Sequence, residues 1–319
     1  MDKILGIDIS KLTFDIALLI EKRVYCKKFS NTPGGFKKLS IWLNDKGVIH
    51  SHACLEATGK YGDRLAIWLQ DNGHKVSVVN PFRIKSFGQS ELTRNKSDKS
   101  DAKLIARFCK NMNPDEWVPP SKEIRELRDW VSRAADLTSM MSQEKNRLEM
   151  QVNQRLKQMV EKNIAWLETQ RDEALEMVQQ IINEHENLKT KHELLRTIPG
   201  LGDKTIGVIL AHIDPERFES ARKLAAFIGL NPRQRLSGTS VKGRARLSKT
   251  GNPELRKAFY MPALVAMKHN PVIKRFTKVL HAKNKAKKAV VGAAMRKLVH
   301  IVYGVLKSRK NFQSSITAA

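Results

Sequence analysis

Four acidic residues stand where the local sequence predicts the end of a strand or the start of a helix, and they constrain the fold more than any other feature. Asp8 lies in ILGIDIS, Glu56 in HACLEATG, and Asp98 and Asp101 in NKSDKSDAKLIARF. Carboxylate oxygens are ligands that Mg²⁺ prefers, and such clusters serve phosphodiester chemistry. Because the chain is strongly basic, a pocket of carboxylates is expected to need cations that neutralise it. We therefore expect a fold that brings these four side chains into one Mg²⁺-binding cluster.

The sequence around the first two acids predicts an α/β domain over residues 1–112. An apolar run at 3–9 predicts a buried strand, and the alternating segments 13–20 and 23–29 predict its two antiparallel partners. A helix, a strand that ends at Glu56, a second helix and a fifth strand follow. This β-β-β-α-β-α-β order is that of a ribonuclease-H-like domain. In open α/β sheets the chemistry gathers at the carboxyl ends of the strands.

Asp98 and Asp101 are three residues apart, so the first turn of a helix places both on one face. A structural explanation is available, because Asp98 suits a helix N-cap and Asp101 suits the positive end of the helix dipole. Taken alone, this pair favours the structural explanation. Together with Asp8 and Glu56 in the expected order, the pair favours a shared metal site.

Residues 113–121 form a linker rich in helix breakers, after which residues 121–196 contain almost no Gly or Pro. Leu127, Ala134, Met141 and Leu148 recur every seven residues, which predicts a long, coiled-coil-like helix. A second apolar stripe in the same segment predicts its partner; its residues are Leu167, Leu175, Val178 and Ile182. The resulting helical hairpin fits a rigid spacer or a subunit-pairing element, and the sequence favours neither.

The sequence of residues 197–319 predicts a third domain that is mostly helical and basic. At its start, TIPGLG lies between two helical patterns, as in a helix-hairpin-helix whose glycine turn faces a phosphate; turns of this kind also occur for packing reasons alone. A polar segment that we expect to be a loop follows, and it contains the hydroxyl residues Ser237, Thr239, Ser240 and Ser248. By residue type alone, each of these serines suits an ordinary turn better than a nucleophile. The basic residues of the segment are Arg233, Arg235, Lys242, Arg244, Arg246 and Lys249. Three basic amphipathic helices are expected after it.

The charge distribution indicates a polyanionic partner. The chain carries 58 Lys and Arg against 32 Asp and Glu, a net charge of +26. Residues 220–319 hold 23 of the basic residues and one acid, Glu254. A segment of this charge repels itself unless a polyanion is near, which favours nucleic acid. Basic amphipathic helices also bind membrane surfaces, but several basic segments together make nucleic acid the simpler interpretation.

Cysteine usage and hydropathy bear on the compartment. Cys26, Cys54 and Cys109 are isolated, without the spacing of a disulfide framework or a zinc site. The sequence contains neither a signal-peptide pattern nor eighteen consecutive apolar residues. We expect a cytoplasmic protein, associated with the nucleoid when it acts, that does not span a membrane.

Several of these motifs together resemble one family. They are GIDIS, LEATGKYG, RNKSDKSDA, TIPGLG, and the block that runs from AAFIGLNPR through RLSGTSVKGRARLSKTGNPELRKAFYMPA. The chain resembles DEDD transposases of the Piv-invertase type, an insertion-sequence family described as bridge-RNA-guided recombinases. The resemblance covers nearly the whole chain, and its motifs occur in the expected order.

The resemblance implies a RuvC-like N-terminal domain in which Asp8, Glu56, Asp98 and Asp101 bind Mg²⁺. It also implies a C-terminal transposase domain whose nucleophile is Ser237, a serine that attacks DNA to leave a phosphoserine link. Acids of one subunit would work with the serine of another, so a homo-oligomer, a dimer or a tetramer, is implied. A structured noncoding guide RNA would pair with donor and target DNA, much as in other guided systems.

Three other functions fit parts of the sequence. The acids alone suit a metal-dependent nuclease or junction resolvase that uses activated water. GIDIS resembles the first phosphate loop of an actin-like ATPase, but Lys11, Leu12 and Phe14 stand where that fold needs a Gly-Thr-rich turn. The charge alone allows a nucleic-acid packaging protein. The recombinase is the favoured function because it uses both the acids and the serine segment.

Overall fold

The computed structural model describes residues 3–57, 59–91, 98–237 and 241–314. The chain divides into two units, unit 1 (Met1–Pro119) and unit 2 (Pro120–Ala319). The boundary lies within the segment that the sequence indicates as a linker. The helices of the expected middle segment belong to unit 2, because they share its core.

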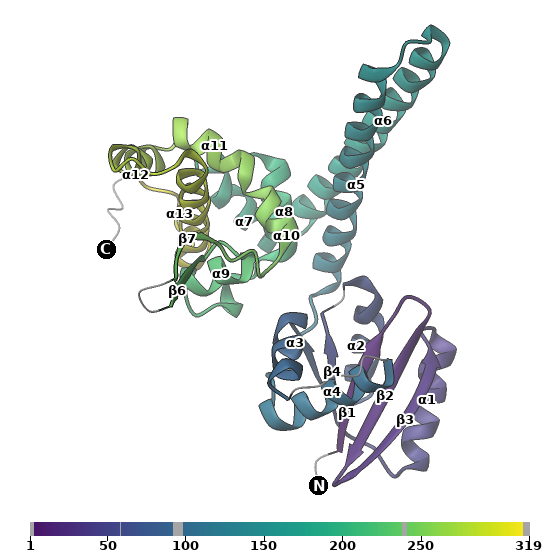
Figure 1. Cartoon of the computed structure of the whole chain (residues 1–319). Coiled ribbons are helices and arrows are strands. Elements are labelled where there is room, and N and C mark those ends of the chain that lie inside the picture. Colours follow the sequence, from purple (N-terminus) through teal and green to yellow (C-terminus); the bar gives the residue numbers. More distant parts are fainter. Residues whose placement is uncertain (1–2, 58, 92–97, 238–240, 315–319) are drawn as a thin grey trace. The chain divides into compact units, whose positions relative to one another are not determined.

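Unit 1 is built on a mixed sheet of five strands in the order β3-β2-β1-β4-β5 (Figure 1). β1 pairs antiparallel with β2 and parallel with β4. The central strands are apolar because both of their faces are covered. The order of strands and helices along the chain agrees with the sequence prediction up to β5. The strands are β1 (Lys3–Ile9), β2 (Thr13–Ile20), β3 (Arg23–Ser30), β4 (His52–Glu56) and β5 (Lys75–Val79).

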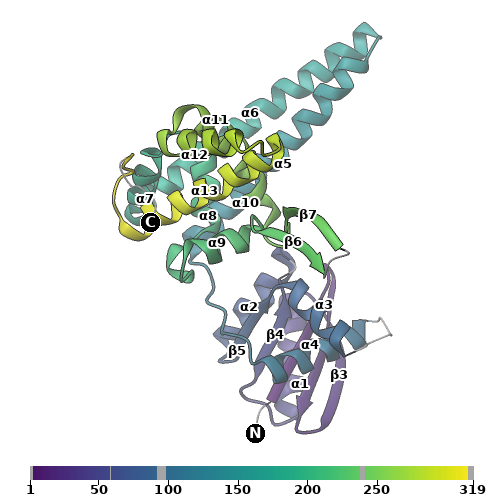
Figure 2. The same ribbon diagram turned by 60° about the vertical axis from the view of Figure 1, so that its left-hand side comes forward.

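Helices cover both faces of this sheet. Leu39 of α1 and Leu65 of α2 belong to the core on one face, together with Leu5 and Ile7 of β1. Helices α3 and α4 pack on the other face, where the core contains Ile4 and, among others, Ala17, Cys54, Ile84, Ala102, Ile105 and Phe108. Figure 2 shows α4 lying across the sheet. The helices are α1 (Pro33–Asp45), α2 (Lys60–Asp71), α3 (Pro81–Ser90) and α4 (Asp98–Met112).

Unit 2 is mostly helical, and one apolar core joins nearly all of its helices. The fully buried residues of this core include Leu195, Ile209, Leu224, Phe259 and Leu298. The helices are α5 (Lys122–Met150), α6 (Gln154–Glu184), α7 (Glu186–Arg196), α8 (Asp203–His212), the short 3₁₀ helix η1 (Pro215–Arg217), α9 (Ala221–Ile228), α10 (Pro253–Ala258), α11 (Tyr260–His269), α12 (Pro271–Ala282) and α13 (Lys287–Ser308). The mixed α/β N-terminal region and the mostly helical C-terminal part are therefore confirmed.

Helices α5 and α6 form the expected hairpin and lie side by side (Figure 1). Leu137 and Met141 of α5 pack against Leu167 of α6 in a small core of their own. At the base of the hairpin, Leu127 of α5 and Ile182 of α6 are buried in the main core of unit 2. The two helices are thus anchored at one end and supported by their own contacts along the rest.

Three local expectations differ from the structure. The expected loop around the hydroxyl residues is a two-stranded hairpin of β6 (Pro232–Ser237) and β7 (Val241–Leu247), because backbone pairing needs no apolar alternation. Within the described residues, four helices follow it and not three, because α10 ends at Ala258 and Phe259 separates it from α11. Helix α3 was not expected; Asn80 caps it by accepting a hydrogen bond from the Phe82 backbone N–H.

Helix α13 is the one candidate membrane span in the part of the chain that the structure describes, by its length and composition. Its apolar residues Val290, Leu298 and Val302 are fully buried in the protein core. Packing within unit 2 therefore accounts for the apolar composition of this helix.

Candidate active site

Asp8 and Glu56 lie at the carboxyl ends of neighbouring parallel strands. Ile7 of β1 pairs with Leu55 of β4, so Asp8 and Glu56 are the next residues on the two strands. Both side chains are half-buried. In β1 the side chains alternate, and Asp8 shares its face with Gly6, the face that α4 covers. The sheet alone therefore brings two of the four predicted acids together.

Gly6 allows α4 to approach this face closely. A Cβ atom on Gly6 would lie 2.2 Å from the backbone oxygen of Ala102 and 2.2 Å from the backbone nitrogen of Ala106, both in α4. Any side chain larger than hydrogen would therefore push the helix away. Asp98 and Asp101 occupy the first turn of α4. The contact at Gly6 thus fixes the helix that carries the other two acids against the strand that carries Asp8.

The electrostatics show that the four acids share one neighbourhood. Burial raises the pKa of Asp8, and the negative charges of Asp101, Asp98 and Asp15 raise it further. Burial also raises the pKa of Glu56, with further contributions from Asp8 and Asp101. Raised pKa values with these causes mean that the carboxylates repel one another. A cation at this position would relieve the repulsion.

Two residues that the sequence did not single out belong to the same neighbourhood. Asp15 of β2 pairs across the sheet with Asp8 and is buried, and Lys28 of β3 pairs with Asp15. Lys28 Nζ lies 3.1 Å from Asp15 Oδ2 and 3.3 Å from Asp98 Oδ2. Hydrogen bonds, first to Asp15 and then to Asp98, raise the pKa of Lys28. The signal for Asp15 was present in the sequence, because it is the one charged residue in the strand TFDIALLI.

The donor set suits a hard divalent cation, since every predicted ligand is a carboxylate. Within the described residues, however, no three His, Cys, Asp or Glu side chains converge into a ready-made metal site. Asp98 is engaged by Lys28, and its side chain is largely exposed. The contact with Lys28 is made through the Oδ2 oxygen of Asp98.

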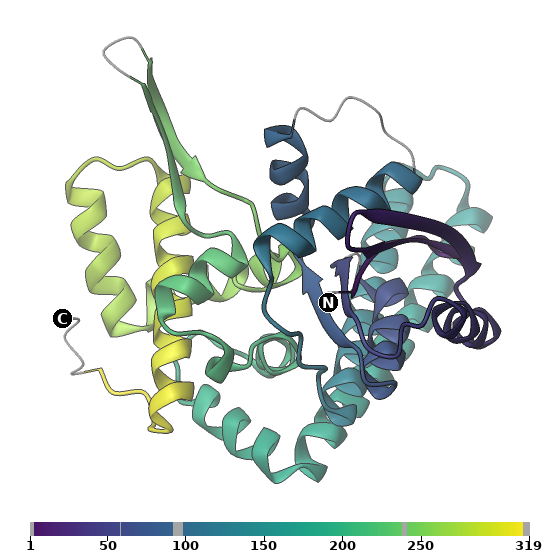
Figure 3. The same cartoon turned by 90° about the horizontal axis from the view of Figure 1, so that it is seen from below.

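The predicted nucleophile, Ser237, is the last residue of β6, and its backbone pairs with Val241 of β7. Figure 3 shows the β6–β7 hairpin extending beyond the helices of unit 2. Arg233, Arg246 and Lys249 are exposed. The side chains of Ser237, Arg235, Lys242 and Arg244, and the whole of Thr239 and Ser240, lie outside what the structure describes. The candidate nucleophile and the acids thus belong to different units of the chain.

A mixed sheet with carboxylates at its strand ends, followed by a strongly basic helical region, is typical of enzymes that process DNA. Family models for "Transposase" of the IS110 DEDD type and for "Transposase IS116/IS110/IS902 family" match residues 5–156 and 192–278. The chain belongs to the IS110 family of DEDD transposases, and it is an enzyme that recombines DNA.

The relatives agree with this membership. The chain is 34% identical to the "Pilin gene-inverting protein" of Moraxella bovis and to that of Moraxella lacunata, over 98% of this chain and 98% of each relative. It is 26% identical, over 39% of its length and 31% of the relative, to the "Insertion element IS110 uncharacterized 43.6 kDa protein" of Streptomyces coelicolor. The family implies a DNA substrate and a divalent metal ion. Membership in this family therefore excludes the packaging protein and the actin-like ATPase.

Proposed function

We propose that this transposase cuts and rejoins DNA through a covalent phosphoserine link formed by Ser237. Asp8, Glu56, Asp98 and Asp101 would hold Mg²⁺ in a RuvC-like unit 1. The observation that carries this proposal is the mutual electrostatic effect of these acids, which the contact of α4 with β1 brings together. The strand order β3-β2-β1-β4-β5 supports the RuvC-like assignment.

In the proposed reaction the Ser237 hydroxyl oxygen forms a bond to phosphorus, and the bond between phosphorus and a sugar oxygen of the DNA breaks. The hydroxyl proton leaves to a base, and the departing sugar oxygen takes up a proton. Mg²⁺ held by Asp8, Glu56, Asp98 and Asp101 would supply Lewis-acid polarisation of the scissile phosphate. The guanidinium groups of the β6–β7 hairpin, among them the exposed Arg233 and Arg246, would hold its non-bridging oxygens.

The partners that we propose follow from the same assignment. Donor and target DNA would be chosen through a structured noncoding guide RNA, and the reaction would take place in the cytoplasm. A homo-oligomer, a dimer or a tetramer, is proposed because the family resemblance implies that the acids of one subunit work with the serine of another. The name of the Moraxella relatives supports inversion as a related outcome, since rejoining after cleavage of two sites also inverts a segment.

The test is a search for the protein–DNA adduct. The wild-type protein, incubated with Mg²⁺, its guide RNA and DNA of the element ends, is expected to form an adduct that survives denaturation. Ser237→Ala is expected to form none, whereas Ser248→Ala, a change in the same basic segment, should form it at the wild-type level. An adduct that persists in Ser237→Ala would refute the assignment of the nucleophile.

A metal-dependent nuclease is the second candidate. All four acids lie in unit 1, and hydrolysis by a metal-activated water needs no serine. It predicts cleaved DNA without any adduct, and the same cleavage by Ser237→Ala. The experiment above separates the two functions.

A further inference from the structure

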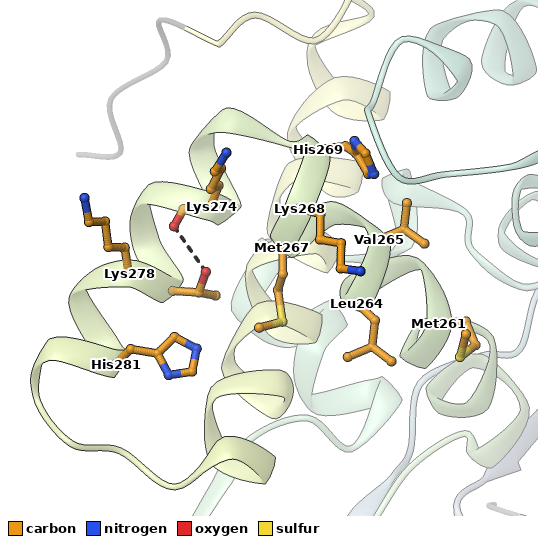
Figure 4. A pocket seen from close by; sticks show the side chains of 10 residues that line it. Met261, Leu264, Val265, Met267, Lys268, His269, Lys274, Lys278 and His281 are labelled. Atoms are coloured by element: carbon orange, nitrogen blue, oxygen red, sulfur yellow. Dashed lines mark hydrogen bonds between the residues drawn. The ribbon is translucent and has the colours of Figure 1, made fainter.

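A groove with a volume of about 760 Å³ lies between α11 and α12 in unit 2. We call it the α11–α12 groove. Its apolar part comes from α11, where Leu264 and Met267 are half-buried and Met261 and Val265 are exposed. Figure 4 shows these residues on α11. The groove is also lined by the buried Thr277 of α12, whose hydroxyl donates to the Lys274 carbonyl oxygen at 3.2 Å. The groove is thus open to solvent, and its apolar surface is formed by side chains of a helix.

Basic side chains surround this apolar surface. Exposed Lys268, Lys274 and Lys278 line the groove together with His269 and His281. In Figure 4 the ammonium groups of Lys274 and Lys278 extend away from the apolar residues of α11. No acidic residue occurs anywhere from residue 255 to the end of the chain. An occupant that is anionic at its edges and apolar at its centre would therefore complement this groove.

We propose that the α11–α12 groove binds an unpaired nucleotide of a nucleic-acid strand, with the base against the apolar side chains of α11, Met261 and Val265 included, and the flanking phosphates at the lysines. A duplex keeps its base faces stacked and offers only phosphates, so it leaves the apolar surface bare. An unpaired strand offers both a flat apolar face and a charged backbone. The volume lies in the range of about 300–1,000 Å³ that holds compact organic ligands. Methionine side chains adapt to bases of different shape, which suits binding without sequence preference.

The proposal rests on the membership of the chain among DNA transposases, since strand exchange exposes unpaired nucleotides, and not on the role of Ser237. It adds a site in unit 2 that is separate from the β6–β7 hairpin. Because binding is read without cleavage, the result is independent of the adduct test above.

The first experiment compares a short oligothymidylate with an abasic strand of the same length, in the presence of excess duplex DNA that occupies other basic surfaces. We expect wild-type protein to bind the strand with bases roughly three- to tenfold more tightly, a modest fraction of full base stacking. In the double variant Met261→Ala, Val265→Ala, the ratio of the affinities for the strand with bases and the abasic strand should fall close to one. Both residues are well exposed, at 62% and 43%, so the fold should persist, which circular dichroism checks.

Val279→Ala is the matched control, because Val279 is an equally apolar residue of α12, 50% exposed, that does not line the groove. It should keep the wild-type preference. The basic edge is tested by Lys268→Gln and Lys274→Gln, which should weaken both strands alike and lower the salt dependence by about 0.7 for each phosphate that is no longer neutralised. Lys162→Gln, at an exposed lysine of α6 outside the groove, is their control.

A strand that carries 5-iodouracil locates the contact. Ultraviolet crosslinks are expected in a peptide that contains residues of α11 or α12. Binding of oligothymidylate and of oligouridylate is measured in parallel. The strand that binds more tightly identifies DNA or RNA as the source of the nucleotide.

The proposal is overturned if bases and abasic sites bind equally well, or if the double variant and Val279→Ala behave alike. It is also overturned if the crosslinks lie only outside α11 and α12. Displacement of the strand by an acidic amphipathic peptide or by anionic vesicles, at concentrations below those of the strand itself, would assign the groove to that other partner.

Discussion

At the scale of single residues, Asp8 shows how one position serves both the sheet and the site. It continues the pairing of β1 with β2, and its carboxylate lies among the charges of Asp101, Asp98 and Asp15. A carboxylate in this position destabilises the fold unless a cation is bound, as is common where activity needs a destabilised site. In the proposed function, the placement that raises the pKa of Asp8 is also the one that would let it bind the cation.

Asp8→Asn is expected to raise the melting temperature of the protein in EDTA, because it removes repulsion from the cluster. It should also reduce the further increase that Mg²⁺ causes in the wild type, abolish strand cleavage and leave DNA binding intact or slightly stronger. Differential scanning calorimetry with and without Mg²⁺ measures the first two effects. Asp45→Asn, an exposed acid at the end of α1, should change neither. Equal stabilisation of Asp8→Asn and wild type by Mg²⁺ would contradict the metal assignment.

Gly6→Ala tests the contact that places α4. The added methyl would collide with backbone atoms of Ala102 and Ala106, and overpacking of this kind costs about 1–3 kcal/mol. We expect a lower melting temperature of unit 1 and a weaker response to Mg²⁺, since Asp98 and Asp101 move with α4. Gly34→Ala is the control, because the nearest atom to a Cβ there would be Thr32 Oγ1 at 4.0 Å. A normal response of Gly6→Ala to Mg²⁺ would show that the helix position does not matter.

At the scale of elements, the turn TIPGLG between α7 and α8 is part of the core. Gly200 has a φ of 104°, and a Cβ there would lie 2.9 Å from the backbone nitrogen of Ala266 in α11. Asn270 donates a hydrogen bond to the Pro199 carbonyl oxygen at 3.4 Å. Packing is therefore a sufficient reason for the glycine of this turn, and a phosphate-binding role is not needed to explain it.

His212, at the end of α8, makes the stability of the folded protein depend on pH. Burial, and then the positive charge of Arg128, lower its pKa to about 4. Glu254 Oε2 lies 3.4 Å from His212 Nε2, but this carboxylate is 65% exposed, and burial outweighs it. The folded protein therefore disfavours protonated His212, while the unfolded chain protonates it near the ordinary histidine pKa of 6.5.

Because the unfolded chain binds the proton more readily, the contribution of His212 to the free energy of unfolding is fully present above pH 6.5 and is lost as the pH drops towards 4. The share of His212 in this decrease is at most about 3 kcal/mol. Urea unfolding between these pH values measures this decrease in the free energy of unfolding. His212→Gln should make the free energy of unfolding depend less on pH. Part of the dependence should remain, because His74, His192 and His300 also have lowered pKa values. His281→Gln, an exposed histidine, should leave the curve unchanged. Identical curves for both variants would rule out His212 as a source.

At the scale of the whole molecule, the net charge of +26 makes DNA binding strongly dependent on salt. We expect unit 2 to carry most of this dependence, since residues 220–319 contain one acid. Replacing Lys283, Lys285, Lys287 and Lys288 by Gln should reduce the slope of log K against log salt by up to about 4, at roughly 0.9 per duplex phosphate contact. The same number of changes in unit 1, at Lys22, Lys37, Lys38 and Lys46, should reduce it less. Equal reductions in fluorescence anisotropy titrations would show that the two units share the phosphate contacts.

The order of the strands and helices of unit 1 up to β5 and the helical hairpin of α5 and α6 could be predicted, because burial of one face leaves a period of two or 3.6 residues in the sequence. The four acids could be selected for the same reason, since strand ends and helix starts are local features. The β6–β7 hairpin and α3 could not, because their formation depends on backbone pairing and on caps more than on an apolar period. Asp15 was overlooked because its importance comes from the neighbours Asp8 and Lys28, which lie on adjacent strands.

The charge of this protein, the order of most of its elements and the chemical types of its candidate ligands follow from the sequence alone, since each is a property of composition or of short-range pattern. The fold in three dimensions adds that α4 lies against Gly6, that Lys28 joins Asp15 to Asp98, and that α11 and α12 enclose a groove with an apolar centre and basic edges. The physical reason is that these contacts join residues from different elements, and close packing between elements, not the preference of any single segment, selects which of them meet.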